Sequence, residues 1–119
     1  MRTYLLVAVA GTLGAAIRWG IGDLIDHRPA TFPWATLSAN VAGCALIGLA
    51  ARSLARGSDR WQFAVTGLLG GLTTFSTFAV ETRELVDADR AGLALGYVAA
   101  SVVVGLAAVE VARHGWRSR

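Results

Sequence analysis

Three long stretches without any charged side chain constrain the fold of this chain more than any other feature. They run from Pro29 to Ala51, from Trp61 to Val80 and from Ala91 to Val109. A fourth stretch, Thr3 to Gly22, is interrupted only by Arg18. A helix needs about 20 mostly apolar residues to cross a hydrocarbon core, and each stretch is long enough. The pattern predicts an all-α integral membrane protein with spans near residues 3–22, 33–51, 61–80 and 91–112.

Composition supports the same class. The chain has 119 residues, of which 55% are hydrophobic and only 16% charged. A soluble domain of this size buries too small a share of its surface to hide that much apolar material. A cleavable signal peptide is the alternative for the first stretch, but such a peptide has a shorter apolar run, and this one is long and contains Arg18. We therefore expect one four-helix membrane domain over residues 1–119.

The basic residues indicate orientation in a membrane rather than binding to nucleic acid. All eleven are arginines, and most flank the expected spans, as the positive-inside rule describes. With four spans, the termini and the second loop share one side. That side holds seven arginines and the other side three, at positions 2, 52, 56, 60, 113, 117 and 119 against 28, 83 and 90. The bias favours termini in the cytoplasm.

Small residues four apart recur in every expected span, for example Gly11 with Ala15, Gly67 with Gly71, and Gly92 with Gly96. Such pairs allow close helix packing in lipid. Four thin helices enclose little volume, so we expect a pathway or site to form between two copies of the chain. The single cysteine, Cys44, lies in mid-span, cannot form a disulfide within the chain and is expected to be a packing residue.

Polar side chains inside the spans are candidates for function, because they are costly in a bilayer. Asn40 lies in the middle of the second span, with Thr36 one turn earlier on the same face. In the fourth span Tyr97 and Ser101 are also four apart, and Gly105 continues that stripe. Hydrogen bonding between helices is the alternative role for these residues.

Four ionisable residues receive structural or solvent-exposed interpretations. Arg18 should point into protein, where its guanidinium can either snorkel to a polar end of the span or bond main-chain carbonyls and an acid from another segment. Glu81 lies at the trailing end of the third span and is assigned a structural polar role, with an ordinary solvated helix end as the alternative. His27 and His114 lie outside the spans and have no metal-ligand spacing.

The segment "GGLTTFSTF", Gly70 to Phe78, is the least helical part of the expected third span. Its two glycines and four hydroxyl side chains predict an interruption near the bilayer centre. Broken helices are tolerated there only where the freed backbone groups face protein, ions or water, and their exposed amides suit anions while their carbonyls suit cations. Phe75 and Phe78 add rings whose electropositive edges suit an anion. A flexible kink with packing phenylalanines is the alternative.

These residues resemble a known family over nearly the whole chain. The strings "GTLGAAIR", "PWATLSANVAG", "GLLGGLTTFSTFAVE" and "YVAAS" are similar to those of the small bacterial fluoride channels, the Fluc or CrcB family. The third string is the specific one, and the other three support it.

The resemblance implies a dual-topology dimer of antiparallel subunits in the bacterial plasma membrane, with two pores that let fluoride leave the cytoplasm passively. Phe75 and Phe78 would line each pore. The polar groups along the ion's path would be Asn40, Thr36, Tyr97 and Ser101, with the hydroxyls of Thr74 and Thr77. A structural Na⁺ would be held by the main-chain carbonyls of Gly70 and Thr73 from both subunits.

Two features depart from the family pattern. Gly105 stands where the stripe of the fourth span often continues with another hydroxyl, which implies a shorter or wetter polar track. The arginine bias of seven to three is unexpected for a homodimer of opposed subunits, since the same chain must insert both ways. The partner is therefore either a second copy or a paralogous subunit of opposite bias.

Other functions fit the sequence less well. A proton-coupled exporter of the small multidrug-resistance type needs a carboxylate embedded in the membrane. The first span has no acid before Asp23, and Glu81 and Glu110 lie toward span ends. An inert assembly subunit would explain the small-residue packing but not the interrupted third span. No nucleophile–base pair or phosphate-binding loop indicates an enzyme.

Overall fold

The computed structural model describes residues 1–25 and 28–115. His27, Arg117 and Arg119, which entered the sequence predictions, lie outside the described residues. The helices, in chain order, are α1 (Arg2–Leu24), α2 (Trp34–Ser53), α3 (Asp59–Trp61), the π-helix η1 (Gln62–Leu69), α4 (Gly70–Leu72), α5 (Ser76–Asp87) and α6 (Ala91–His114).

The expected fold class is confirmed. Four helical segments are long and apolar enough to cross a membrane, namely α1, α2, the composite segment Asp59–Asp87 and α6. The described residues contain no strand. The composite third segment extends beyond its expected end at residue 80 and reaches Asp87. It also changes character along its length, because the π-helix η1 precedes the interruption.

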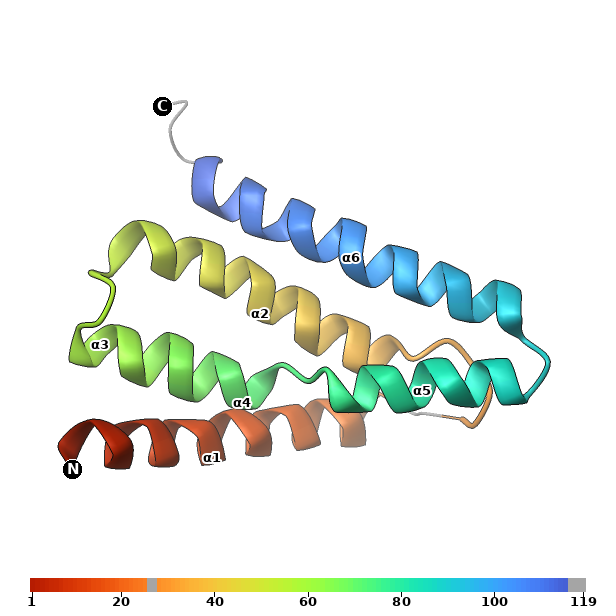
Figure 1. Ribbon diagram of the computed structural model, residues 1–119, viewed down its shortest axis with the longest axis horizontal. Coiled ribbons are helices and arrows are strands. Elements are labelled where there is room, and N and C mark those ends of the chain that lie inside the picture. The colour runs from red at the N-terminus through yellow and green to blue at the C-terminus, as the bar shows by residue number, and fades with distance from the viewer. Residues whose placement is uncertain (26–27, 116–119) are drawn as a thin grey trace.

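The four spans form a thin layer rather than a closed bundle. Figure 1 shows α1 beside the first half of the third span, while α2 lies between that span and α6. The start of α1, the turn from α2 into α3 and the last turns of α6 lie at the same end of the layer. The molecule measures 46 × 38 × 21 Å, so its thinnest direction is about two helix diameters. Such a layer leaves most apolar side chains for lipid or for a second chain.

Glycines set the closest helix contacts. A Cβ built on Gly71 would overlap the carbonyl group of Gly11, and one on Gly67 would lie 2.5 Å from the Cβ of Ala10. These glycines therefore let the third span pack backbone to backbone against α1, as expected in lipid. Gly92 and Gly96 differ, because nothing lies within 4 Å of a Cβ built on either residue. That pair does not serve packing within the chain.

The interruption of the third span is present, but the glycine pair does not form it. Gly70 and Gly71 are helical, and α4 ends only at Leu72. Thr73 is extended, with φ −80° and ψ 156°, and α5 resumes at Ser76. The physical reason is that Gly71 is needed for the close approach to Gly11, whereas threonine and serine hydroxyls compete with the helix for backbone groups.

The fourth span meets α2 at small residues. A Cβ on Gly48 would lie 2.6 Å from the Val109 carbonyl oxygen, and one on Gly105 would lie 3.4 Å from the Cys44 sulfur. Gly105 is buried at this contact. It therefore serves helix packing, and Cys44 is its packing partner.

Candidate functional site

The interruption is held by the side-chain amide of Asn40. Its Nδ2 donates to the Thr74 carbonyl oxygen at 3.0 Å, and its Oδ1 accepts from the Thr74 main-chain N–H at 2.8 Å. In a continuous helix, that N–H would donate to the carbonyl of Gly70 four residues earlier. Asn40 thus replaces helical hydrogen bonds with two bonds from α2, which satisfies the requirement that a broken backbone find partners inside a bilayer.

Hydroxyl groups gather where the third span resumes. Thr74 Oγ1 accepts from the Thr77 N–H at 3.2 Å, and it lies 3.0 Å from Thr77 Oγ1 and 3.3 Å from Ser76 Oγ. Thr73 Oγ1 instead bonds back to the Leu69 carbonyl at 2.9 Å. The first amides of a helix and nearby hydroxyl donors favour an anion, so the start of α5 is the electropositive side of the break.

A groove of about 380 Å³ opens beside the break. Its lining brings together six residues that were predicted to belong to the site, namely Asn40, Thr73, Thr74, Phe75, Phe78 and Ser101. Cys44, Ile47 and Val102 complete it. None of the described residues that line this groove is charged, so its polar character comes from an amide, hydroxyls and backbone groups. We call it the break groove.

The two phenylalanines differ in their surroundings. Phe75 is 80% exposed, whereas the ring of Phe78 is half-buried and lies 5.1 Å from the Tyr97 ring. The centroids of the Phe75 and Phe78 rings are 5.8 Å apart. Both rings line the break groove, but only Phe78 is fixed by packing within the chain. Phe75 projects to where a second molecule or lipid must cover it.

A second cavity of about 390 Å³ also lies against Thr74. It is lined by Arg18, Trp19, Gly22, Asp23, Ala35, Thr36, Thr74, Thr77 and Glu81. Thr74 lines both hollows. The polar residues predicted along one track are therefore divided between two hollows that meet at the break, with Asn40 and Ser101 in one and Thr36 and Thr77 in the other.

Glu81 connects three helices, a role that the sequence interpretation did not recognise. Its Oε1 accepts from the Thr36 hydroxyl at 2.7 Å, and its Oε2 accepts from the Tyr97 hydroxyl at 2.7 Å. Tyr97 is fully buried, so its hydroxyl faces Glu81 and lines neither hollow. Glu81 follows Thr77 by four residues, which places the two on one helix face. That spacing was the sequence feature that could have indicated that Glu81 lies near the site.

Arg18 bonds the interrupted span, in line with the interpretation that it points into protein. Its Nε donates to the Gly71 carbonyl oxygen at 3.2 Å. In a continuous helix that oxygen would accept from the N–H of Phe75, which lies in the break. Arg18 from α1 and Asn40 from α2 therefore both supply partners to the backbone around the interruption.

The predicted Na⁺ ligands lie on the α4 side of the break. Thr73 has an extended conformation, and Gly70 is exposed without lining either hollow. Their main-chain carbonyls are oxygen donors of the kind that suits a hard cation. Among the described residues, no three histidine, cysteine, aspartate or glutamate side chains gather to hold a metal ion.

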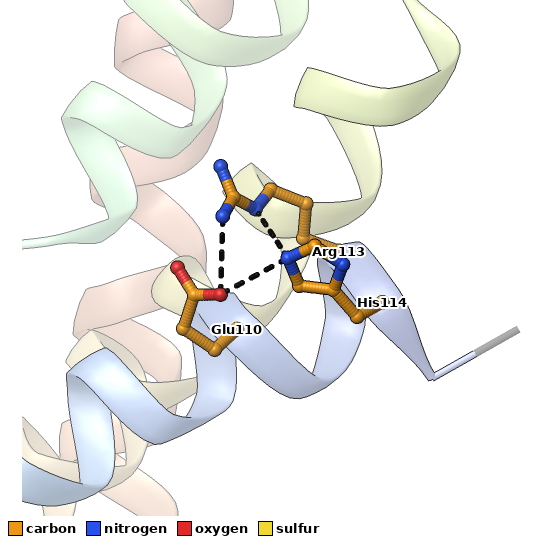
Figure 2. A network of polar contacts seen from close by, with 3 residues as sticks. All are labelled: Glu110, Arg113 and His114. Atoms are coloured by element: carbon orange, nitrogen blue, oxygen red, sulfur yellow. Dashed lines mark hydrogen bonds and ion pairs between the residues drawn. The ribbon is translucent and has the colours of Figure 1, made fainter. Parts of the chain in front are cut away.

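A separate polar cluster lies at the end of α6 and takes no part in this site (Figure 2). Glu110 Oε2 lies 3.2 Å from both Arg113 Nη2 and His114 Nε2. The Arg113 Nε also donates to His114 Nε2 at 3.2 Å. Because that bond needs an unprotonated Nε2 and the Glu110 hydrogen bond needs a protonated one, the two cannot form at the same time. All three side chains are about half exposed, so the cluster contributes little stability.

Fold and site together define a multi-pass membrane protein with a polar interruption inside its third span. Residues 5–113 match the family described as CrcB-like protein, Camphor Resistance (CrcB). The chain is 48% identical to a fluoride-specific ion channel FluC of Paracoccus denitrificans, over 90% of this chain and 88% of the relative. It is 42% identical to one of Thermus thermophilus, over 89% and 88%. A FluC 2 of Symbiobacterium thermophilum is 47% identical, over 91% and 92%.

The chain belongs to the CrcB family. The resemblance seen in the sequence motifs is thereby confirmed. The curated relatives are ion channels by name and not enzymes.

Proposed function

We propose that this chain forms a fluoride-selective channel through which fluoride leaves the cytoplasm down its electrochemical gradient. The observation that carries the proposal is the break groove, where an amide, hydroxyls and two phenylalanine rings surround the interrupted third span. The names of the relatives support fluoride as the ion and do not favour the exporter alternative. No nucleotide or redox cofactor is needed for passive flow.

The chemistry of the break groove suits a small, strongly hydrated anion. Such an ion enters a narrow path only if protein donors replace its lost water. Asn40 Nδ2, the hydroxyls of Thr74 and Ser101 and the ring edges of Phe75 and Phe78 offer weak, repeated partners. Conduction also requires release, and a groove without a fixed cation in its described lining holds the ion less tightly.

A second subunit, inserted antiparallel, would close the break groove into a pore. The thin four-helix layer and the 80% exposure of Phe75 support this assembly, because an open groove facing lipid cannot carry an ion. Two-fold symmetry would then give two pores per dimer. The dimer would sit in the bacterial plasma membrane.

A structural Na⁺ at the centre of this dimer follows from the same arrangement. The carbonyls of Gly70 and Thr73 from both subunits would hold the ion, and its charge would stabilise the backbone around the interruption. Replacing Na⁺ by a larger organic cation should then lower the thermal stability of the purified dimer while leaving the monomer's helical content unchanged.

The partner is either a second copy or a paralogous subunit. The arginine bias of the chain favours termini in the cytoplasm, and a heterodimer would pair it with a chain of opposite bias. Relatives named FluC 2 support the existence of paralogous FluC chains. Expression of this chain alone in a strain without other fluoride channels distinguishes the two, because full fluoride protection would exclude an obligatory second gene.

Fluoride efflux from liposomes containing the purified protein tests the proposed function, with chloride as the control ion. Phe75→Ile and Phe78→Ile should each slow fluoride efflux at least tenfold while the dimer stays intact. Tyr4→Ile is a matched control, because Tyr4 is 79% exposed, like Phe75, but lies near the start of α1. Normal efflux through both phenylalanine variants would show that the rings do not line the path.

A further inference from the structure

A second groove, far along the chain from the break, runs between the first turns of α1 and the start of the third span. Two adjoining hollows of about 440 and 400 Å³ share Arg2, Leu6 and Phe63 in their linings. The first also contains Arg60, and the second Leu5 and Val9. We call the combined hollow the N-terminal groove. It lies at the end of the layer where α1 begins and α2 turns into α3 (Figure 1).

The chemistry of the N-terminal groove changes along its length. Arg2 and Arg60 stand at the end of the span, whereas Leu6, Val9 and Phe63 lie deeper. The seven helical steps from Arg2 to Val9 cover about 10 Å along the α1 axis at 1.5 Å per residue. A cationic mouth above an apolar floor of this depth matches a molecule with an anionic head and a hydrocarbon chain.

The mouth keeps a net positive charge after its ion pair is counted. Arg2 Nη2 lies 3.3 Å from Asp59 Oδ2, but their side chains are 83% and 53% exposed, so this pair is weak and an anion can compete for Arg2. Arg60 supplies the second cation. Two arginines and one aspartate leave one positive charge at the mouth.

We propose that the N-terminal groove binds one anionic phospholipid. Arg60 and Arg2 contact the phosphate or an acidic headgroup, and an acyl chain lies against Leu6, Val9 and Phe63. Anionic lipids attract arginines at a membrane surface, and the groove adds a place for the chain. The proposal does not depend on the conducted ion, since the groove and the break groove share no residue.

The test measures lipid retained by the purified full-length protein. Delipidated protein in a neutral detergent is titrated with phosphatidylglycerol or phosphatidylcholine of equal chain length, and bound lipid is counted by native mass spectrometry. Phosphatidylglycerol should bind more tightly. Arg60→Gln should weaken it about fivefold, which corresponds to about 1 kcal/mol for one arginine at an anionic surface. Arg90→Gln, an exposed arginine preceding α6, is the matched control and should have no effect.

Two further measurements separate the groove from general surface attraction. Ala64 also lines the first hollow of the N-terminal groove. Ala64→Leu fills the apolar floor without changing charge and should weaken binding of the lipid, with circular dichroism verifying the fold. Glycerol phosphate, which lacks chains, should not displace the lipid. Equal binding of the two phospholipids, equal effects of Arg60→Gln and Arg90→Gln, or displacement by glycerol phosphate would each overturn the proposal.

A second subunit is the competing occupant of this groove. A cysteine introduced at Leu5, in a Cys44→Ala background, reports on it. This cysteine should react with a lipid-soluble maleimide. Phosphatidylglycerol should slow the reaction, and phosphatidylcholine should not. Complete protection in both lipids would show that protein covers the groove and would overturn the proposal.

Discussion

Removing the Asn40 amide should destabilise the protein specifically at the interrupted span. In Asn40→Ala, the main-chain N–H and carbonyl of Thr74 lose partners at 2.8 and 3.0 Å. Interhelical hydrogen bonds in membrane proteins contribute about 0.6 kcal/mol each on average and about 1.7 at most. Two such bonds give a loss of about 1–3 kcal/mol in the free energy of unfolding. We expect about 2 kcal/mol, the middle of this range.

The assay is reversible unfolding of the purified protein in mixed micelles, followed by circular dichroism. Asn40→Asp separates the two bonds, since a carboxylate still accepts from the Thr74 N–H but cannot donate to its carbonyl. The free energy of unfolding of Asn40→Asp should fall by at least the contribution of one hydrogen bond. Ser38→Ala, two residues earlier on the exposed face of α2, is the control and should stay within about 0.5 kcal/mol. If Asn40→Ala also stays within that range, the amide does not hold the break.

Three other substitutions test the packing and the polar contacts. Gly71→Ala places a methyl group against the Gly11 carbonyl and should lower the free energy of unfolding by about 1–3 kcal/mol. Gly20→Ala is the control, because a Cβ there meets nothing within 4 Å, and it should be neutral or stabilising by up to about 1 kcal/mol. Similar values for both variants would refute the close approach of the third span to α1. Tyr97→Phe removes a hydrogen bond to the Glu81 carboxylate and should cost about 1.5–3 kcal/mol in the same unfolding assay; no loss would mean that this contact does not form. Glu110→Gln breaks exposed ion pairs and should change stability by less than about 1 kcal/mol, and a larger loss would show that the α6 cluster is buried in the assembly.

The residues of the break groove were largely predictable from their types and positions. A polar amide in mid-span, a run of hydroxyls and two phenylalanines in an uncharged stretch stand out because a bilayer penalises unpaired polar groups. Their pairing was not predictable. Nothing local indicates that Asn40 bonds Thr74, 34 residues later, because that contact depends on how α2 packs against the third span.

The hydrogen bonds of Glu81 were also not predictable from the sequence. Its place near the end of an apolar run left a solvated helix end as the alternative to a structural polar role, and it indicated no partner. The length of the third span, which continues to Asp87, instead brings the carboxylate between Thr36 and Tyr97. The two hydroxyls come from α2 and α6, so only the packing of three helices reveals the contact.

Sequence alone determined that four helices cross a membrane and that the third is interrupted, because hydrophobic length and the cost of unpaired backbone groups act locally along the chain. Tertiary structure decided where the interruption falls. Gly71 stays helical because α1 needs its bare backbone for contact, and the break moves to Thr73 through Phe75, where Asn40 and Arg18 from neighbouring helices supply the missing hydrogen bonds. The local sequence therefore makes an interruption possible, and helix packing determines its position.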